Sequence, residues 1–377
     1  MQHCKLVGFF YFKRGGEEIA NNYEGIKTQK FGIEIEMTGL TRSRAAKAVA
    51  KHFNTTAEHL GGSYDTYIIR DNQSRKWKIV SDGSIQCYKK DGSSASNLYS
   101  VELVSPICEY EDIPIIQQLV RDLRLAGGIC NQSTGIHIHI NAAPYDAQKL
   151  RNIVNIVASK EDMLYKALQV DCDRQRYCRK TDQDFLEKLN ARKPRTLQAL
   201  QNLGYNGRDG SHLHYHNSRY HLLNLHSVFS MGTVEIRAFN STLHAGVIRS
   251  YLVLCLAISN QALQQKSAQC RPTQSSNEKY TFRTWILRLG LNGEEFKNCR
   301  KHLLEHLDGC IAWKNPEDAI RQRERLKHER DAERLQAVTH SQEQAEEMPS
   351  HTESSEIDSS EEVLEEMNEE ISYEMSM

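Results

Sequence analysis

The sequence predicts a mixed α+β fold built on an antiparallel sheet, and two patterns support this prediction. Several short segments alternate between apolar and polar residues with period two, which is typical of half-buried strands. Longer segments between them repeat apolar residues at helical spacing. With 377 residues, of which 39% are hydrophobic, the chain is long enough to bury a sizeable core. These values exclude a fibrous or wholly disordered protein.

The predicted strands fall into two groups along the chain. Alternation is clearest in FGIEIEM at 31–37 and GIHIHIN at 135–141. Because successive side chains of a strand point to opposite faces, the two glutamates of the first segment share a face, as do the two histidines of the second. We expect further strands at 64–70, 76–80, 99–104, 220–226 and 233–239.

Helical spacing of apolar residues predicts the helices that separate and follow these strands. They are expected at 42–52, 111–126, 147–170, 182–201, 244–264, 280–289, 294–307 and 316–339. Gly127 and Gly128 are expected to end the second helix, because glycine accepts the left-handed backbone that closes a helix. The last helix is strongly charged, which is typical of an exposed helix with ion pairs between residues i and i+4.

Composition divides the chain into four parts. We expect an N-terminal extension at 1–29, a main domain at 30–310, a charged helix at 311–340 and an acidic disordered tail at 341–377. The tail holds 13 of the 49 acidic residues and none of the 48 basic ones, so the rest of the chain carries a net charge of +12. A segment with so few apolar residues cannot offset the entropy lost on ordering.

Cysteine usage and hydropathy predict a cytoplasmic protein without a membrane span. The ten cysteines are scattered and no CxxC pair occurs, so reduced thiols are expected rather than disulfides. No apolar stretch is expected to approach the roughly 20 residues that a membrane helix needs. The segment LVGFFYF at 6–12 lacks a small-residue cleavage site, and we predict a strand or loop there rather than a signal sequence.

Polar side chains come in pairs on the predicted strands. The usual explanation is that they form the solvated face of an antiparallel sheet. The residue types argue against it, because carboxylates and imidazoles replace the threonine, lysine and serine of ordinary solvated faces. Like charges two residues apart, about 7 Å along a strand, repel unless a cation lies between them. Carboxylate-rich ligation favours Mg²⁺ or Mn²⁺. The residues are Glu34, Glu36, Glu102, His137, His139, Glu235 and Arg237.

A second group of histidines follows in HLHYH, with His212, His214 and His216, and His221 lies just beyond. Alternating histidines are able to bind Zn²⁺. No cysteine or carboxylate lies within the segment, so we favour a polar loop or strand edge near the site. A zinc hydrolase is therefore a minor alternative.

Two further features have both a functional and a structural interpretation. The basic cluster of Arg174, Arg176 and Arg179 could hold substrate carboxylates, but a solvated helix surface is slightly favoured. Asp82 lies in the turn SDGS and could bind the amine of a substrate. Capping of the turn is at least as good an explanation for it.

Six segments of the chain resemble, in the same order, those of the putative amidoligase family. This family belongs to the carboxylate–amine ligases related to glutamine synthetase and glutamate–cysteine ligase. The resemblance covers about residues 30–307 and implies a glutamine-synthetase-like catalytic domain, in which a curved antiparallel sheet forms a funnel with helices on its outer face. The segments are FGIEIE at 31–36, WKIVSDGSI at 77–85, ELVSPI at 102–107, STGIHIHI at 133–140, RYHLLNL at 219–225 and TVEIRAFNSTL at 233–243.

The resemblance also implies roles for individual residues. Glu34 and Glu36 would be ligands of two different metal ions. Glu102 would join one ion, whereas His137 and Glu235 would join the other.

The remaining roles concern the nucleotide. His139 would lie towards the nucleotide and Arg237 towards the γ-phosphate. Arg219 would be a second phosphate contact. With the paired glutamates, Arg237 would form the catalytic group.

The implied activity is that of an ATP- and Mg²⁺- (or Mn²⁺-) dependent ligase that joins a carboxylate to an amine through an acyl phosphate. Its substrates would be small-molecule or peptide carboxylates and amines, with glutamate as a guess for the carboxylate. A phosphotransferase acting on guanidino or carboxylate groups is the nearest alternative. A non-catalytic protein whose basic body binds nucleic acid or an acidic partner is less favoured, because basic and aromatic residues are not clearly interleaved.

Overall fold

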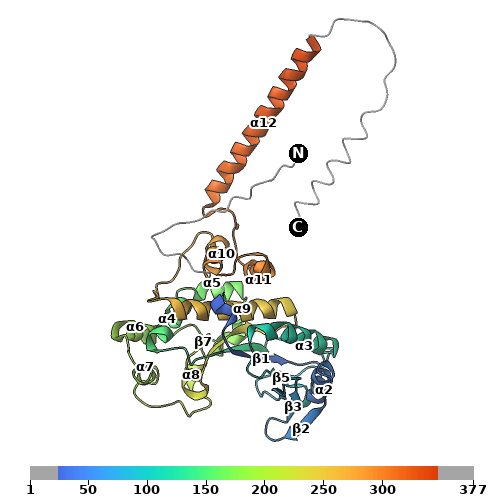
Figure 1. Cartoon of the computed structure of the whole chain (residues 1–377), viewed down its shortest axis with the longest axis vertical. Helices are drawn as coiled ribbons and strands as arrows, with labels where there is room; N and C mark the ends of the chain where they lie inside the picture. The colour runs from blue at the N-terminus through green and yellow to red at the C-terminus, as the bar shows by residue number, and fades with distance from the viewer. Residues whose placement is uncertain (1–23, 347–377) are drawn as a thin grey trace, which may run out of the picture. The chain divides into compact units, whose positions relative to one another are not determined.

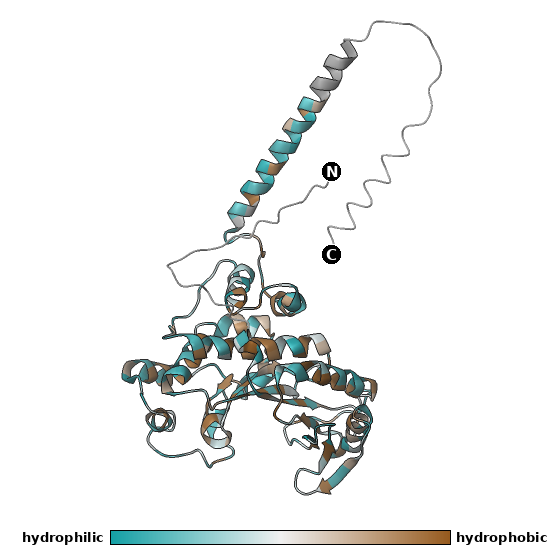
Figure 2. Cartoon of the chain, in the orientation of Figure 1, coloured by the Kyte–Doolittle hydropathy of each residue, from teal (hydrophilic) through white to brown (hydrophobic). Residues whose placement is uncertain are grey.

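In a computed structural model of the protein, which describes residues 24–346, the chain divides into two compact units with the boundary after Pro316. Except for its first residue, the helix α12, Pro316–Glu346, belongs to the second unit, and it is mostly hydrophilic (Figure 2). This helix was predicted to end near residue 339 and continues to Glu346. The disordered tail was predicted to begin at residue 341, but residues 341–346 belong to α12. The rest of the predicted tail lies outside the described residues, as does the strand or loop predicted at 6–12.

The first unit is built around one open eight-stranded antiparallel sheet (Figure 1), which confirms the predicted mixed α+β class. The strand order is β2-β3-β4-β5-β1-β6-β8-β7. The glutamine-synthetase-like funnel stays a prediction. The strands are β1 Phe31–Met37, β2 Ala57–Gly61, β3 Thr66–Arg70, β4 Lys76–Val80, β5 Val101–Val104, β6 Gly135–Asn141, β7 Leu223–Asn224 and β8 Thr233–Asn240.

The helices follow the predicted periodicity, with breaks that the spacing alone does not show. The helix expected at 182–201 is two helices, because Lys193 has a left-handed backbone and Pro194 lacks an N–H donor. The helix expected at 147–170 is also divided. The helices of this unit are α1 Glu24–Lys27, α2 Arg42–His52, α3 Ile113–Leu125, α4 Ala147–Ala158, α5 Glu161–Ala167, α6 Gln183–Arg192, α7 Leu197–Gly204, α8 His226–Met231, α9 Ala245–Gln264, α10 Glu278–Arg288 and α11 Lys297–Leu304.

Two differences from the expected strands lie at the edges of the sheet. The edge strand β2 was not predicted, because its sequence AEHLG has no β-branched residue and its side chains are mostly exposed. The strand expected at 220–226 keeps only Leu223–Asn224. A short 3₁₀ turn, Asn217–Arg219, precedes it and α8 begins at His226.

Helices α3, α4 and α9 lie along one side of the sheet (Figure 1), and the apolar faces of the strands pack towards them. On β1, Ile33 and Ile35 are fully buried, and on β6 Ile136 and Ile138 are as well. Since strand side chains alternate, burial of these residues turns their polar neighbours to the opposite side of the sheet.

Helix α9 is long and apolar enough to cross a membrane by length and composition alone, which corrects the expectation that no stretch approaches that length. However, 67% of its most apolar window is buried inside the protein. It contacts α3, α4, α11 and β6. We therefore regard α9 as the central core helix, and a cytoplasmic location stays a prediction.

A partly buried ion-pair network ties the β3–β4 hairpin to the turn that precedes α3. The guanidinium of Arg75 donates to Asp71 at 2.8 Å and makes two bonds to Asp112, at 2.7 and 2.8 Å. Trp77 also donates to Asp71, at 3.2 Å. Burial on its own would raise the pKa of both aspartates, but the hydrogen bonds from Arg75 outweigh it and leave each pKa below the ordinary value.

Candidate active site

The strand register aligns the predicted polar residues on one face of the sheet. Glu34 on β1 lies directly opposite His137 on β6. Glu36 lies directly opposite Glu102 on the other neighbouring strand, β5. Residues directly opposite each other in an antiparallel pair have Cβ atoms about 5 Å apart and point to the same side. These four side chains therefore form one continuous polar area.

Strand β8 extends this area by two more residues. Glu235 lies opposite His139 of β6, and Arg237 follows two positions later on the same face. The pairing of β6 with β8 shifts register between Ile136 and Ile138, at the position of His137. Such irregularities bend a strand and change the direction of a side chain. We call the seven aligned residues the polar face: Glu34, Glu36, Glu102, His137, His139, Glu235 and Arg237.

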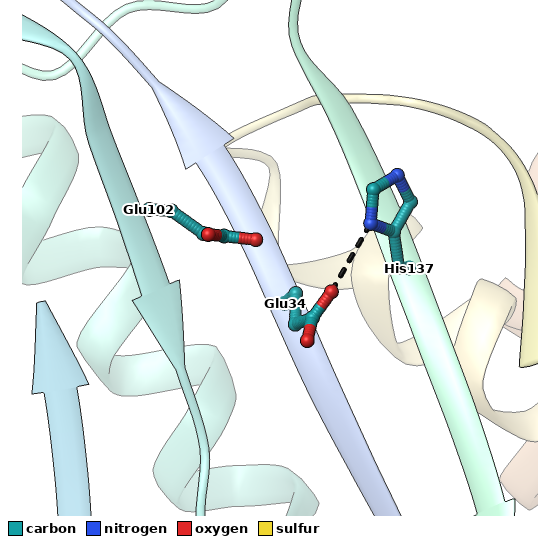
Figure 3. Close-up of side chains that lie close together, drawn as sticks. All are labelled: Glu34, Glu102 and His137. Atoms are coloured by element: carbon teal, nitrogen blue, oxygen red, sulfur yellow. Dashed lines mark hydrogen bonds and ion pairs between the residues drawn. The ribbon is translucent and has the colours of Figure 1, made fainter. Parts of the chain in front are cut away.

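Three members of the polar face form a triad from adjacent strands (Figure 3). Glu34, Glu102 and His137 each offer one ligand atom, and these atoms all lie within 4.8 Å of one another. His137 Nδ1 is 3.1 Å from a carboxylate oxygen of Glu34. Two carboxylates and one imidazole suit a hard divalent cation such as Mg²⁺ or Mn²⁺.

The electrostatics of the triad also suit a cation. Burial, followed by the negative charges of Glu34, Glu36 and Asp82, raises the pKa of Glu102 well above its ordinary value. For Glu34, burial acts in the same direction, but the hydrogen bond with His137, the close approach of His139 and the charges of both imidazoles outweigh it and hold its pKa well below the usual range. A divalent cation between these carboxylates would replace their repulsion by attraction. The oxygen and nitrogen donors of Glu34, Glu102 and His137, and the negative charge of the two carboxylates, therefore fit the predicted Mg²⁺ or Mn²⁺ ion.

Glu36 is 3% exposed and lies beside the triad rather than in it. One of its oxygens accepts a hydrogen bond from the backbone N–H of Gly135 at 2.7 Å. The other is 3.9 Å from His137 Nε2. Burial raises the pKa of Glu36, although the charges of His137 and Arg174 oppose that effect.

Glu235 is held by neighbours on its other side. One oxygen accepts from Asn224 Nδ2 at 2.6 Å, and the other forms a buried ion pair with Arg237. Burial alone would raise the pKa of Glu235, but the charges of Arg237 and His139 lower it. His139 Nδ1 bonds to Thr233 Oγ1 at 2.9 Å. Its Nε2 atom lies 3.5 Å from Glu34 and 4.0 Å from Glu235.

The resemblance implied that these ligands divide between two metal ions. The side chains that lie close together in the structure form a different set. Glu102 and His137, which were assigned to different ions, share one triad with Glu34. Glu36 and Glu235 lie beside this triad and are held by other partners. Their assignment as metal ligands stays a prediction.

Arg174 is a site residue for which a surface position was slightly favoured. It is 4% exposed and reaches the polar face, where its Nη1 atom is 3.9 Å from Glu36. Arg176 and Arg179, from the same basic cluster, are exposed as predicted. One signal in the sequence pointed to Arg174. Gly135 begins an otherwise bulky strand, and glycine in a strand often marks the close approach of another group.

Arg219, the second phosphate contact implied by the resemblance, lies in the loop before β7. Its Nη1 atom donates to the carbonyl of His214, and its guanidinium lies 5.8 and 5.7 Å from the ring centroids of Tyr215 and Tyr220. These contacts are all within its own loop. Its role at the nucleotide stays a prediction.

The histidine-rich loop borders a cavity of about 390 Å³ between α6, α7 and α8. His216 lines this cavity and stacks on His226 with 5.7 Å between ring centroids, whereas His212 and His214 are exposed. Among residues 24–346, the metal-binding geometry is found in the polar-face triad and not in this loop. The structure thus agrees with a polar loop there.

Asp82 performs the turn-capping role that was considered for it. Its carboxylate accepts from the backbone N–H of Ser84 at 2.6 Å. It also lies close enough to the polar face for its charge to raise the pKa of Glu36 and of Glu102. The two interpretations of Asp82 are therefore compatible.

Comparison with known protein families matches residues 27–259 to a family described as "Putative amidoligase enzyme". The matched segment contains the whole polar face, together with Arg174 and the histidine-rich loop. A search of curated proteins found no significant match.

Proposed function

The chain belongs to the putative amidoligase family, and we propose that it is an ATP- and Mg²⁺-dependent ligase that joins a carboxylate to an amine through an acyl phosphate. The family indicates a ligase that acts on small molecules. The use of ATP, the use of Mg²⁺ and the acyl-phosphate intermediate are our proposal. The observation that carries it is the combination, on one sheet face, of a carboxylate–imidazole triad with two buried guanidinium groups.

Unsatisfied polar atoms support a ligand at this place. In the described part of the chain, five buried side-chain nitrogen or oxygen atoms have no hydrogen-bond partner. Three of them lie here: His139 Nε2, Arg174 Nε and Arg237 Nε. Native proteins leave few buried polar groups unpaired, because each costs about 1–3 kcal/mol. A bound anion would accept hydrogen bonds from the two guanidinium groups and remove part of that cost.

The polar face contains the groups that this reaction needs. Attack of a carboxylate on ATP brings anions together, and their repulsion has to be offset before an acyl phosphate forms. Glu34, Glu102 and His137 would hold Mg²⁺, which when bound supplies neutralisation of phosphate charge. Arg237, fixed by its ion pair with Glu235, would bind the phosphoryl group in transfer. Donors fixed in this way stabilise developing charge without reorganising.

The amine substrate needs a site of its own, because it has to reach the acyl carbon after the phosphoryl group has moved. Asp82 is the carboxylate at the edge of the polar face that is not assigned to the metal. It would attract the ammonium form of the amine and take up the proton that the nitrogen has to lose. The neutral amine then attacks the acyl carbon and displaces phosphate, which leaves the amide bond.

The test is an incubation of the protein with ATP, Mg²⁺ and pooled carboxylates and amines, including the common amino acids. We expect release of ADP and phosphate that requires both substrates, and a product lighter by one water than their sum. Glu34→Ala is expected to lose this activity. A stable phosphorylated product would indicate the alternative phosphotransferase. No substrate-dependent phosphate release from the wild-type protein would contradict both.

A further inference from the structure

Arg174 reaches the polar face from outside the sheet. It lies in the 3₁₀ turn Cys172–Arg176, and its side chain is 5% exposed. Its Nη1 atom is 3.9 Å from Glu36, and its Nη2 atom is 3.4 Å from the backbone carbonyl of Arg237. The turn therefore adds a second buried guanidinium to the polar face, beside that of Arg237 on β8.

The guanidinium of Arg174 occupies the space that a side chain at position 135 would fill. A Cβ atom built on Gly135 would lie 2.1 Å from both Nη1 and Nη2 of Arg174. Position 135 is two residues before His137, so that side chain would point to the polar face. Glycine at this position thus permits the cation to lie against β6.

The contacts of Arg174 leave most of its donors free. A guanidinium has five N–H donors, and among residues 24–346 this one makes a single long hydrogen bond, to the carbonyl of Arg237. A simple counter-ion of Glu36 would make a charge-assisted bond of about 2.8 Å, which is much shorter than the observed 3.9 Å. Its Nε atom is buried and has no hydrogen-bond partner in the part of the chain that the structure describes, and the same is true of Arg237 Nε. Two neighbouring cations with free donors form a site for an oxyanion.

We propose that Arg174 and Arg237 together bind an oxyanion, the phosphoryl group in transfer, and that Gly135 is required to make room for Arg174. The identity of the anion rests on the proposed function, whereas the binding of an oxyanion does not. A substrate carboxylate has the same chemistry for a guanidinium, since both accept paired N–H donors. The test therefore uses one probe of each kind.

The test is calorimetric titration of the full-length protein with inorganic phosphate and, separately, with succinate. Arg174→Gln is expected to weaken phosphate binding by about 10- to 100-fold, the usual loss for hydrogen bonds to a charged group. Arg176→Gln is the matched control, because Arg176 is exposed on the same turn. It should bind phosphate like the wild type. Loss of succinate binding alone would overturn the phosphoryl assignment.

Two further variants keep the test decisive if Arg174→Gln fails to fold. Gly135→Ala retains the arginine but displaces its guanidinium, and should reproduce the loss of phosphate affinity. Arg174→Lys retains the charge but not the planar donor geometry, and should bind phosphate more weakly than the wild type. Circular dichroism identifies the variants that are folded. If these bind phosphate with wild-type affinity, the proposal is wrong. Because neither ATP nor amine is present, this result is independent of the ligase assay.

Discussion

Replacing Glu34 by glutamine is expected to abolish tight Mn²⁺ binding. It should also lower substrate-dependent phosphate release by about 10³-fold or more, because a bound metal ion contributes several kcal/mol to phosphoryl transfer. Glu34 is the central member of the triad, opposite His137 and next to the strand that carries Glu102. Glutamine keeps its size and removes the charge. Titration with Mn²⁺ and the phosphate assay measure the two effects.

Glu58→Gln is the matched control for this experiment. The strand pairings place Glu58 on the same side of the sheet as Glu34, but four strands away on β2, where it is exposed. The same chemical change there should leave both measurements at the wild-type value. If Glu34→Gln also kept metal binding and activity, the triad would not be the metal site.

Replacing Arg75 by methionine is expected to lower the free energy of unfolding by about 3 kcal/mol, because it leaves two buried carboxylates without their counter-ion. Asp71 and Asp112 have side chains that are 3% and 9% exposed, so water replaces the lost bonds poorly. The midpoint of urea unfolding measures the change. Arg121→Met is the control, since Arg121 is exposed on α3 and, within residues 24–346, its side chain bonds to Gln118 alone.

This network also predicts how stability depends on pH. Because the pKa values of Asp71 and Asp112 are below the ordinary value in the folded protein, their contribution is complete above about pH 4 and is lost as the pH falls further. Without the Arg75 guanidinium the folded state loses the largest of the interactions that lower these pKa values, although Trp77 and backbone N–H groups still donate to the carboxylates. We therefore expect the acid-induced loss of stability to shrink in Arg75→Met. An unchanged acid transition would show that other carboxylates control it.

Much of the fold follows from local patterns in the sequence. The bounds predicted for β1, α2, β4 and β6 agree with the structure residue for residue, because strict alternation or a compact helical repeat marks both ends. The short strand β7 and helix α8 were not separated. Their ends depend on a turn and a helix start that tertiary contacts select, so periodicity does not show them.

The sequence alone predicts which side chains share one face of the sheet. It does not predict which of them lie within reach of one another. Alternation within each strand showed which side chains point the same way. The distances that place Glu102, Glu34 and His137 in one triad depend on register between strands that are far apart in sequence. Arg174 comes from outside the sheet, and its local sequence is typical of a charged surface. Only its fit against Gly135 distinguishes it from Arg176.

The most direct test of the proposed reaction uses the carboxylate substrate labelled with ¹⁸O in both carboxyl oxygens. An acyl phosphate forms when one of these oxygens bonds to the γ-phosphorus of ATP. Attack by the amine then breaks the bond between that oxygen and the acyl carbon. Mass spectrometry should therefore find one ¹⁸O atom in each phosphate released and one in the amide. Amide formation with unlabelled phosphate would contradict the proposed mechanism.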